Sequence, residues 1–138
     1  MNRFDLQKLA ELRMKEANAL LDAGCFEGAY YLAGYAVECA IKACIAKLTK
    51  EFDFPDKETV NRSYTHKLEQ LIQVAQLKEE LEKESAANPT IERYWNAVKD
   101  WKEEVRYELE VSEARARNFY QAITDADNGV MQWLKKSW

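Results

Sequence analysis

Polar side chains within one strongly apolar segment are the residues of this chain most able to do chemistry. Residues 29–47 read AYYLAGYAVECAIKACIAK and are too apolar for a helix that lies on a surface. Four polar side chains recur there at spacings of four, three and four, which puts them on one stripe of a helix: Tyr31, Tyr35, Glu38 and Lys42. Polar groups on a buried helix must be paired, or must face a cleft or a partner. The stripe therefore predicts a binding cleft, a dimer interface or an internal ion pair.

Two groups elsewhere in the chain are further candidates. His66, the only histidine, follows Thr65, a predicted helix N-cap; a helix dipole there favours a neutral ring. Arg106 precedes Tyr107, and its planar fork suits a phosphate or a carboxylate. Both have plainer interpretations, since His66 could be an ordinary first-turn residue and Arg106 could form a structural ion pair with Glu38.

Helices must position these groups, because Ala, Glu, Lys, Leu and Arg dominate and there are only 4 glycines and 2 prolines. Hydrophobic periodicity predicts five helices, at residues 5–23, 26–49, 65–81, 89–107 and 113–134. The predicted fold class is all-α, an up-and-down bundle of about five helices. We expect one domain over residues 1–138. The short connection at Gly24 predicts that the first two helices form an antiparallel hairpin.

Local signals refine these boundaries. Side chains that suit an N-cap mark three helix starts: Asp5, Thr65 and Ser112. Residues 50–64 lack helical periodicity and predict a loop, which Phe52 and Phe54 could pin to the bundle. Residues 85–89 predict a second loop, and Gly129 could kink or split the last helix.

Composition excludes several classes of protein. The formal net charge of −4 gives no general basic field for nucleic acid, although local basic patches stay open. No apolar run is long enough for a membrane span, and the N-terminus lacks the apolar core of a signal peptide. The cysteines are odd in number and lack the CxxC spacing, which predicts reduced thiols and a cytoplasmic protein: Cys25, Cys39 and Cys44. We expect neither a metal site nor a cofactor.

Three segments together resemble the HEPN domain, the nucleotide-binding family of higher eukaryotes and prokaryotes. The most specific is YYLAGYAVECAIKA at residues 30–43, which is similar to the second helix of the family. The segment THKLEQL at residues 65–71 resembles the Thr-His-x-Leu that opens the next helix. Arg106 and Tyr107 follow at the expected end of the fourth helix, so the resemblance spans nearly the whole chain.

The resemblance implies an α-helical bundle that commonly forms a homodimer around a shared cleft. Many members are metal-independent ribonucleases, whereas others bind nucleotides or partner proteins. Prokaryotic members are often encoded beside a small nucleotidyltransferase, as toxin and antitoxin. On this basis Tyr31, Tyr35, Glu38, Lys42, Arg106 and Tyr107 are the expected cleft residues.

The ribonuclease motif of the family, an Arg followed after four to six residues by a His, is absent here. From Arg106 the permitted positions hold Val111, Ser112 and Glu113. Three interpretations follow. The chain could be a non-catalytic dimeric module that binds a nucleotide, RNA or a nucleotidyltransferase-like partner. It could be a divergent ribonuclease toxin in which Arg106 acts with His66 or Tyr107, which requires His66 near Arg106 in space. It could also be a structural interaction scaffold.

Overall fold

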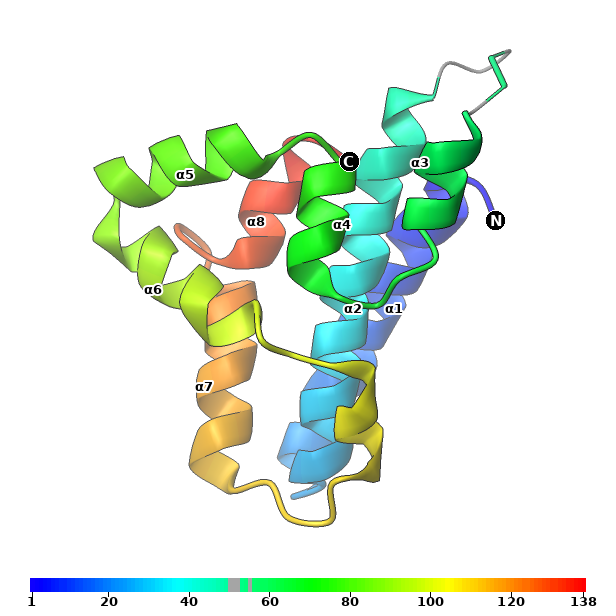
Figure 1. Ribbon diagram of the computed structural model, residues 1–138. Helices are drawn as coiled ribbons and strands as arrows, with labels where there is room; N and C mark the ends of the chain where they lie inside the picture. Colours follow the sequence, from blue (N-terminus) through cyan, green and yellow to red (C-terminus); the bar gives the residue numbers. More distant parts are fainter. Residues whose placement is uncertain (50–52, 55) are drawn as a thin grey trace.

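The computed structural model describes residues 1–49, 53–54 and 56–138, and all regular structure in that part is helical (Figure 1). The elements are α1 (Arg3–Asp22), α2 (Phe26–Leu48), α3 (Lys57–Arg62), α4 (Leu68–Val74), α5 (Lys78–Ala87), α6 (Pro89–Val98), the 3₁₀ helix η1 (Glu103–Tyr107), α7 (Glu113–Thr124) and α8 (Val130–Lys135). The all-α fold class is confirmed. The expected count of about five helices is wrong, because eight α-helices occupy the described residues.

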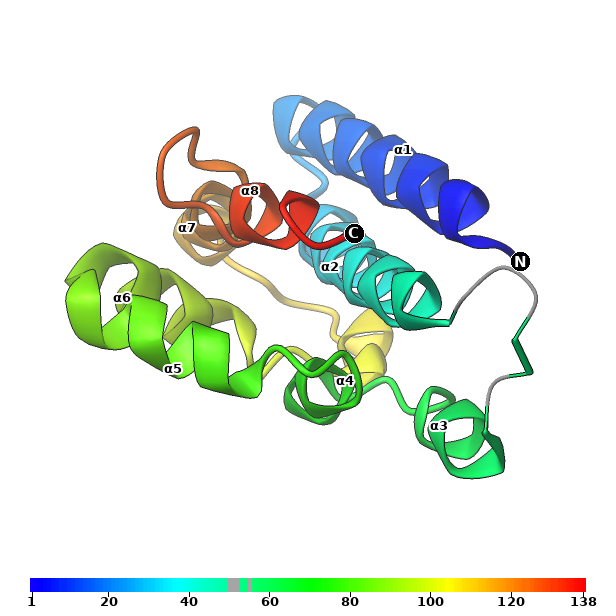
Figure 2. The same cartoon turned by 90° about the horizontal axis from the view of Figure 1, so that it is seen from above.

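Helix α2 lies at the centre of the molecule. It packs on α1, α4, η1, α7 and α8, and Figure 2 shows it enclosed by these elements when the bundle is seen from above. Small side chains dominate its buried surface and let neighbouring helices approach closely, among them Ala33, Gly34, Ala36 and Ala40. The buried helix with one polar stripe is therefore the element that positions the candidate site.

Helices α1 and α2 form the expected hairpin. Gly24 connects them with φ of 77°, a left-handed conformation that glycine adopts without strain. Helix α1 begins two residues earlier than predicted because Asn2, rather than Asp5, is its N-cap. The Asn2 side chain accepts from the Asp5 N–H at 2.8 Å, and the Asp5 carboxylate accepts from the Asn2 N–H at 3.2 Å. This reciprocal pair is a capping box.

The predicted loop at residues 50–64 contains a helix. Asp56 caps α3, and its carboxylate accepts from the backbone N–H of Thr59 at 2.9 Å and from the Thr59 hydroxyl at 2.7 Å. These bonds stabilise one short turn of helix despite its weak periodicity. Phe54 is 99% exposed and does not pin the segment, whereas Phe52 lies outside the described residues.

The predicted third helix is two helices. The first of them, α4, begins at Leu68, and its N-cap is Lys67 rather than the predicted Thr65. The Thr65 hydroxyl accepts from the Lys67 N–H at 3.2 Å, before the helix begins. Gln76, with φ of 59°, ends α4 and redirects the chain into α5. Helix α5 then runs through most of the predicted second loop. Only Asn88 separates α5 from α6. The Asn88 side chain caps α6 by accepting from the backbone N–H groups of Thr90 and Ile91.

The predicted fourth helix ends nine residues early, at Val98. The Trp101 N–H bonds to the Val98 carbonyl at 3.0 Å, and the chain then turns toward α2. Arg106 and Tyr107 consequently lie on η1, a short 3₁₀ helix packed on α2, instead of at the end of a long helix. This turn carries the two residues to the polar stripe of α2.

The last predicted helix is split at Gly129, as the sequence allowed. Ser112 caps α7, where its hydroxyl accepts from the Arg115 N–H at 3.1 Å. Gly129 is the N-cap of α8, and a Cβ there would lie 2.5 Å from the Asp125 carbonyl oxygen. The lack of a side chain therefore permits the tight turn between α7 and α8.

Candidate functional site

A chain of five charged or titratable side chains links α2 to η1. Lys42 Nζ lies 3.3 Å from Glu38 Oε2, and Glu38 Oε1 lies 2.9 Å from His66 Nδ1. On the other side of the ring, His66 Nε2 lies 3.0 Å from Glu103 Oε2, and Glu103 Oε1 lies 2.9 Å from Arg106 Nη1. Basic and acidic side chains therefore alternate across three segments of the fold.

His66 is not in the first turn of a helix, contrary to the prediction. It lies in the connection between α3 and α4, with Lys67 as the following N-cap. The helix-dipole argument for a neutral ring therefore does not apply, and two carboxylates flank the imidazole instead. Nδ1 of the ring is hydrogen-bonded to Glu38, and Nε2 makes a close ion-pair contact with Glu103.

Glu38 is the only buried charged side chain among the described residues, at 2% exposed. A carboxylate so far from water needs partners, and here Lys42 and His66 supply them. The suggested ion pair between Arg106 and Glu38 is wrong, because Arg106 bonds Glu103. Glu38 therefore fixes the inner nitrogen of His66 and leaves the outer one facing η1.

The two tyrosines of the stripe extend the site along α2. The rings of Tyr31 and Tyr35 stack with centroids 6.2 Å apart, and Tyr31 also stacks on Trp101 at 6.0 Å. Burial, and then the thiol of Cys39 and the carboxylate of Glu38, raise the pKa of the Tyr35 phenol. Both phenols are partly exposed and so form an aromatic wall beside the charged groups.

Trp101 sets the position of η1 against that wall. Its indole is 2% exposed and lies directly on Gly34, where any Cβ would overlap the ring. The Trp101 Nε1–H is the one buried side-chain polar atom without a hydrogen-bond partner among the described residues. The close fit of the indole on a glycine of α2 fixes where the chain enters η1.

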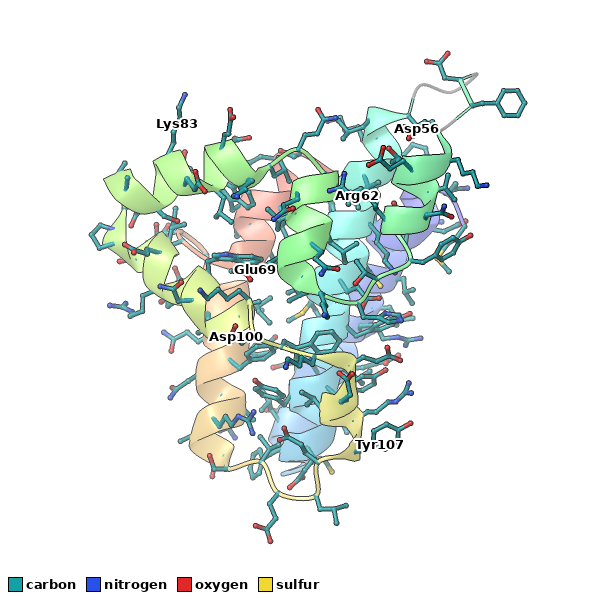
Figure 3. All side chains as sticks on the ribbon, viewed as in Figure 1. Asp56, Arg62, Glu69, Lys83, Asp100 and Tyr107 are labelled. Carbon is teal, nitrogen blue, oxygen red and sulfur yellow. The ribbon has the colours of Figure 1, made fainter. Side chains whose placement is uncertain are left out.

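Arg106 and Tyr107 occupy the outer edge of the site. The guanidinium carbon lies 4.9 Å from the centroid of the Tyr107 ring. Hydrogen bonding to Tyr107 first, and then contacts with Tyr31 and Glu103, raise the pKa of the Arg106 guanidinium against a smaller opposing effect of desolvation. Tyr107 is 70% exposed, and Figure 3 shows its ring pointing away from α2. Of the expected cleft residues it is the most exposed, and Arg106 is also open to solvent.

A groove of the described residues lies away from this chain of side chains. It has a volume of about 580 Å³, runs between α4, α5 and α6, and mixes Glu69, Lys78 and Glu92 with apolar side chains. A second groove, of about 370 Å³, is lined by residues of α1, α2 and α3, including Lys42 and Tyr64. It meets the charged chain at its Lys42 end. We place the candidate site on the charged chain because only there do candidate acid–base and anion-binding groups converge.

Glu103 is the member of the site that the sequence did not identify. It precedes Arg106 by three residues, but that spacing is common on charged surface segments. Its role depends on the turn after Val98, which the periodicity concealed. Through His66 and Glu103, the structure links Glu38 and Lys42 to Arg106, with Tyr107 at the rim; that these residues line a binding cleft stays a prediction.

The described part of the chain has neither a membrane-spanning helix nor a cluster of candidate metal ligands. No helix there is long and apolar enough to cross a membrane. No group of three or more His, Cys, Asp or Glu side chains in that part is arranged to hold a metal ion. The three cysteines are unpaired; Cys25 is exposed, whereas burial raises the pKa of the Cys39 thiol to about 11 and of the Cys44 thiol to about 12.

Comparisons with known proteins support the resemblance that the sequence suggested. No curated protein and no solved structure matched the chain. The family model of the HEPN domain matches residues 5–137, which includes every member of the charged chain. The protein therefore belongs to the HEPN domain family.

Proposed function

We propose that this protein is a nucleotide- or RNA-binding module whose phosphate site lies between His66 and Arg106. The observation that carries the proposal is that nitrogens of both side chains lie within 3.0 Å of one carboxylate, Glu103. Groups that jointly bind a carboxylate suit a phosphate, because the two anions present similar pairs of oxygens. Membership of a family of nucleotide-binding domains supports the same class of ligand.

Aromatic rings beside the anion site support a ligand that carries a base. Tyr31 and Tyr35 form a wall next to Arg106, and Tyr107 presents an exposed ring. Stacking on aromatic side chains tolerates every base and is a general mode of single-stranded nucleic-acid binding. The proposed ligand therefore combines a phosphate with a stackable base, either as a free nucleotide or within RNA.

We also propose that the module acts as a homodimer and serves a co-encoded nucleotidyltransferase-like protein in a toxin–antitoxin pair. Both proposals are supported by the family, whose members commonly form homodimers and, in prokaryotes, are often encoded beside a small nucleotidyltransferase. The exposed apolar side chains around η1, Tyr107 and Leu109, offer surface for a second copy. The unpaired thiols support a cytoplasmic setting.

Fluorescence anisotropy of a labelled short oligoribonucleotide tests the binding function. We expect Arg106→Ala to weaken binding by about tenfold or more, since a charge-assisted bond to phosphate is lost. Arg93→Ala is the matched control. Arg93 is also exposed, and its guanidinium also lies over the next tyrosine, at 5.5 Å from the Tyr94 ring centroid. Equal losses for the two variants, or no binding by the wild type, would contradict the proposal.

A metal-independent ribonuclease is the second candidate function. One observation favours it: His66 and Arg106 share Glu103, so the spatial proximity that the sequence required for catalysis is present. In such a reaction the 2′-oxygen attacks the adjacent phosphorus, the imidazole takes the 2′-hydroxyl proton, and the 5′-oxygen leaves with a proton from a second acid. Arg106 would stabilise the charge on the phosphorane.

Cleavage of an oligoribonucleotide in the presence of EDTA separates the two candidates. A ribonuclease would produce 2′,3′-cyclic phosphate ends, and His66→Asn would abolish them even at RNA concentrations that saturate the variant. The same oligonucleotide with a 2′-deoxy linkage at every position is the control, since it lacks the nucleophile. Binding without cleavage would leave the non-catalytic module, and neither binding nor cleavage would leave the interaction scaffold.

A further inference from the structure

Glu103 occupies the position that the proposed function gives to a phosphate. One of its oxygens meets His66 Nε2 at 3.0 Å and the other meets Arg106 Nη1 at 2.9 Å. The two donors come from different segments, the α3–α4 connection and η1, yet they converge on one carboxylate. In the free protein the anion site is therefore filled by a side chain of the chain itself.

The two carboxylates that flank His66 differ in their freedom to move. The Glu38 side chain is 3% exposed and is also held by Lys42, so it cannot rotate into water without leaving charges unpaired. The Glu103 side chain is 29% exposed and lies on a short 3₁₀ helix at the surface. Its partners are open as well, with His66 45% and Arg106 43% exposed. Only the outer carboxylate can withdraw at low cost, because surface ion pairs are weak.

We infer that Glu103 is an internal competitor that covers the anion site and must swing out before a phosphate group can bind between His66 and Arg106. This inference rests on the proposed function and adds a gate that controls access to the phosphate site. A phosphate that enters would keep both donors bonded, whereas a Glu103 carboxylate left in place would repel it. Glu38 would continue to hold the inner nitrogen of the imidazole throughout.

The gate has a consequence for selectivity. A ligand must displace a carboxylate that is already paired with two side chains, so a phosphate alone gains little by binding. A nucleotide within RNA brings additional stacking, which the exposed Tyr107 ring can accept. Glu103 therefore favours phosphates that carry bases over free inorganic phosphate.

Two conservative variants one residue apart test the gate. Glu103→Gln removes the competing charge and nearly keeps the side-chain shape. Glu104→Gln changes the net charge equally, on the same 3₁₀ helix, at an exposed position. Anisotropy with a short oligoribonucleotide that lacks a terminal phosphate reports affinity for the internal phosphodiesters. Competition by adenosine monophosphate and by inorganic phosphate identifies which source of phosphate the site prefers. Circular dichroism checks folding, and Glu103→Ala is a second variant should Glu103→Gln misfold.

We expect Glu103→Gln to bind the oligoribonucleotide about tenfold tighter than the wild type and Glu104→Gln to bind within about twofold of it. Inorganic phosphate should compete at lower concentrations against Glu103→Gln than against the wild type. An equal gain in affinity for both variants would show that the effect comes from net charge alone, and would overturn the gate. Unchanged or weaker binding by Glu103→Gln, with normal wild-type binding, would overturn the gate but not the binding function. Binding by neither wild type nor Glu103→Gln would overturn both.

Discussion

Glu38 and His66 are 28 residues apart in the chain, and their side chains meet at 2.9 Å between Oε1 and Nδ1. One partner is buried on the central helix, and the other is partly exposed on a connection between two short helices. The contact ties the α3–α4 segment to α2 and aims the second ring nitrogen at Glu103 on η1. The buried carboxylate thus orients the imidazole of the candidate site, and four predictions concern how that site is held and what the fold around it tolerates.

Replacing Glu38 should destabilise the protein. In Glu38→Gln the charge that pairs with Lys42 is lost and the side-chain N–H₂ group can face Lys42, which only donates; a buried unsatisfied polar group costs about 2 kcal/mol. Urea unfolding at neutral pH measures this change. Glu69→Gln is the control, because its pair with Lys99 spans 3.9 Å at an exposed position and should contribute less than about 0.5 kcal/mol. Equal stabilities for the two variants would show that Glu38 does not depend on its partners.

An added methyl group at Gly34 should displace Trp101. A Cβ at this position overlaps the indole ring, so Gly34→Ala should cost at least about 2 kcal/mol of unfolding free energy. Gly28 lies in the same helix, where a Cβ would meet only the flexible end of Leu20 at 3.2 Å. Gly28→Ala should be neutral or stabilising by up to about 1 kcal/mol, since alanine favours helix. Tryptophan fluorescence in the folded state should change for Gly34→Ala alone. Loss of stability in both variants would implicate α2 in general.

Only one thiol in each folded chain should react with a disulfide reagent at pH 8. Cys25 is exposed, whereas burial raises the pKa of Cys39 to about 11 and that of Cys44 to about 12. A thiol reacts as its thiolate, so the two buried groups stay inert until pH approaches those values or the chain unfolds. Colorimetric titration should count one thiol in buffer and three in urea, with none in buffer for Cys25→Ser. Two or more reactive thiols in the folded state would show that α2 opens readily.

Acid should release the segment between η1 and α7. Glu27 Oε1 accepts the backbone N–H of Val111 at 3.2 Å, and hydrogen bonds from its own N–H and from that of Val111 hold the pKa of Glu27 below its usual value of 4.5. The folded state therefore favours the carboxylate. Its stabilising effect is complete above the usual pKa and disappears as pH falls through the lowered value.

Glu27→Gln should consequently flatten the acid limb of a plot of melting temperature against pH, between about pH 5 and pH 3. Glu92→Gln, at an exposed position of α6, serves as the control and should leave the shape of the curve unchanged. Parallel curves for the wild type and Glu27→Gln would contradict the role of this contact.

The sequence predicted the elements whose signals are local and strong. The apolar composition of α2 showed that it is central, and the glycines at 24 and 129 marked real ends of helices. The missed boundaries depend on weaker or longer-range effects. Thr65 suits an N-cap, but its hydroxyl accepts from the N–H of Lys67, which itself precedes the first residue of α4. The periodicity of residues 89–107 continued beyond Val98, where the packing of Trp101 on Gly34 breaks the helix.

The candidate site could be predicted only in its parts. The spacing of Tyr31, Glu38 and Lys42 fixed a stripe, because helical geometry is regular. The family resemblance singled out Arg106, but it placed the residue at the end of a long fourth helix instead of on η1, and it did not identify Glu103 as the partner. The link through Glu103 requires the turn after α6 and the loop that carries His66, and no local pattern encodes the distance between them.

The most direct test of the central claim uses the fact that His66 is the only histidine of the chain. Its imidazole signals in a heteronuclear NMR spectrum therefore need no assignment by mutation. Titration with a short oligoribonucleotide should shift these signals in a saturable way, with the same midpoint as the anisotropy curve, and Arg106→Ala should move both midpoints together. Binding by anisotropy that leaves the imidazole signals unchanged would place the ligand elsewhere and contradict the account.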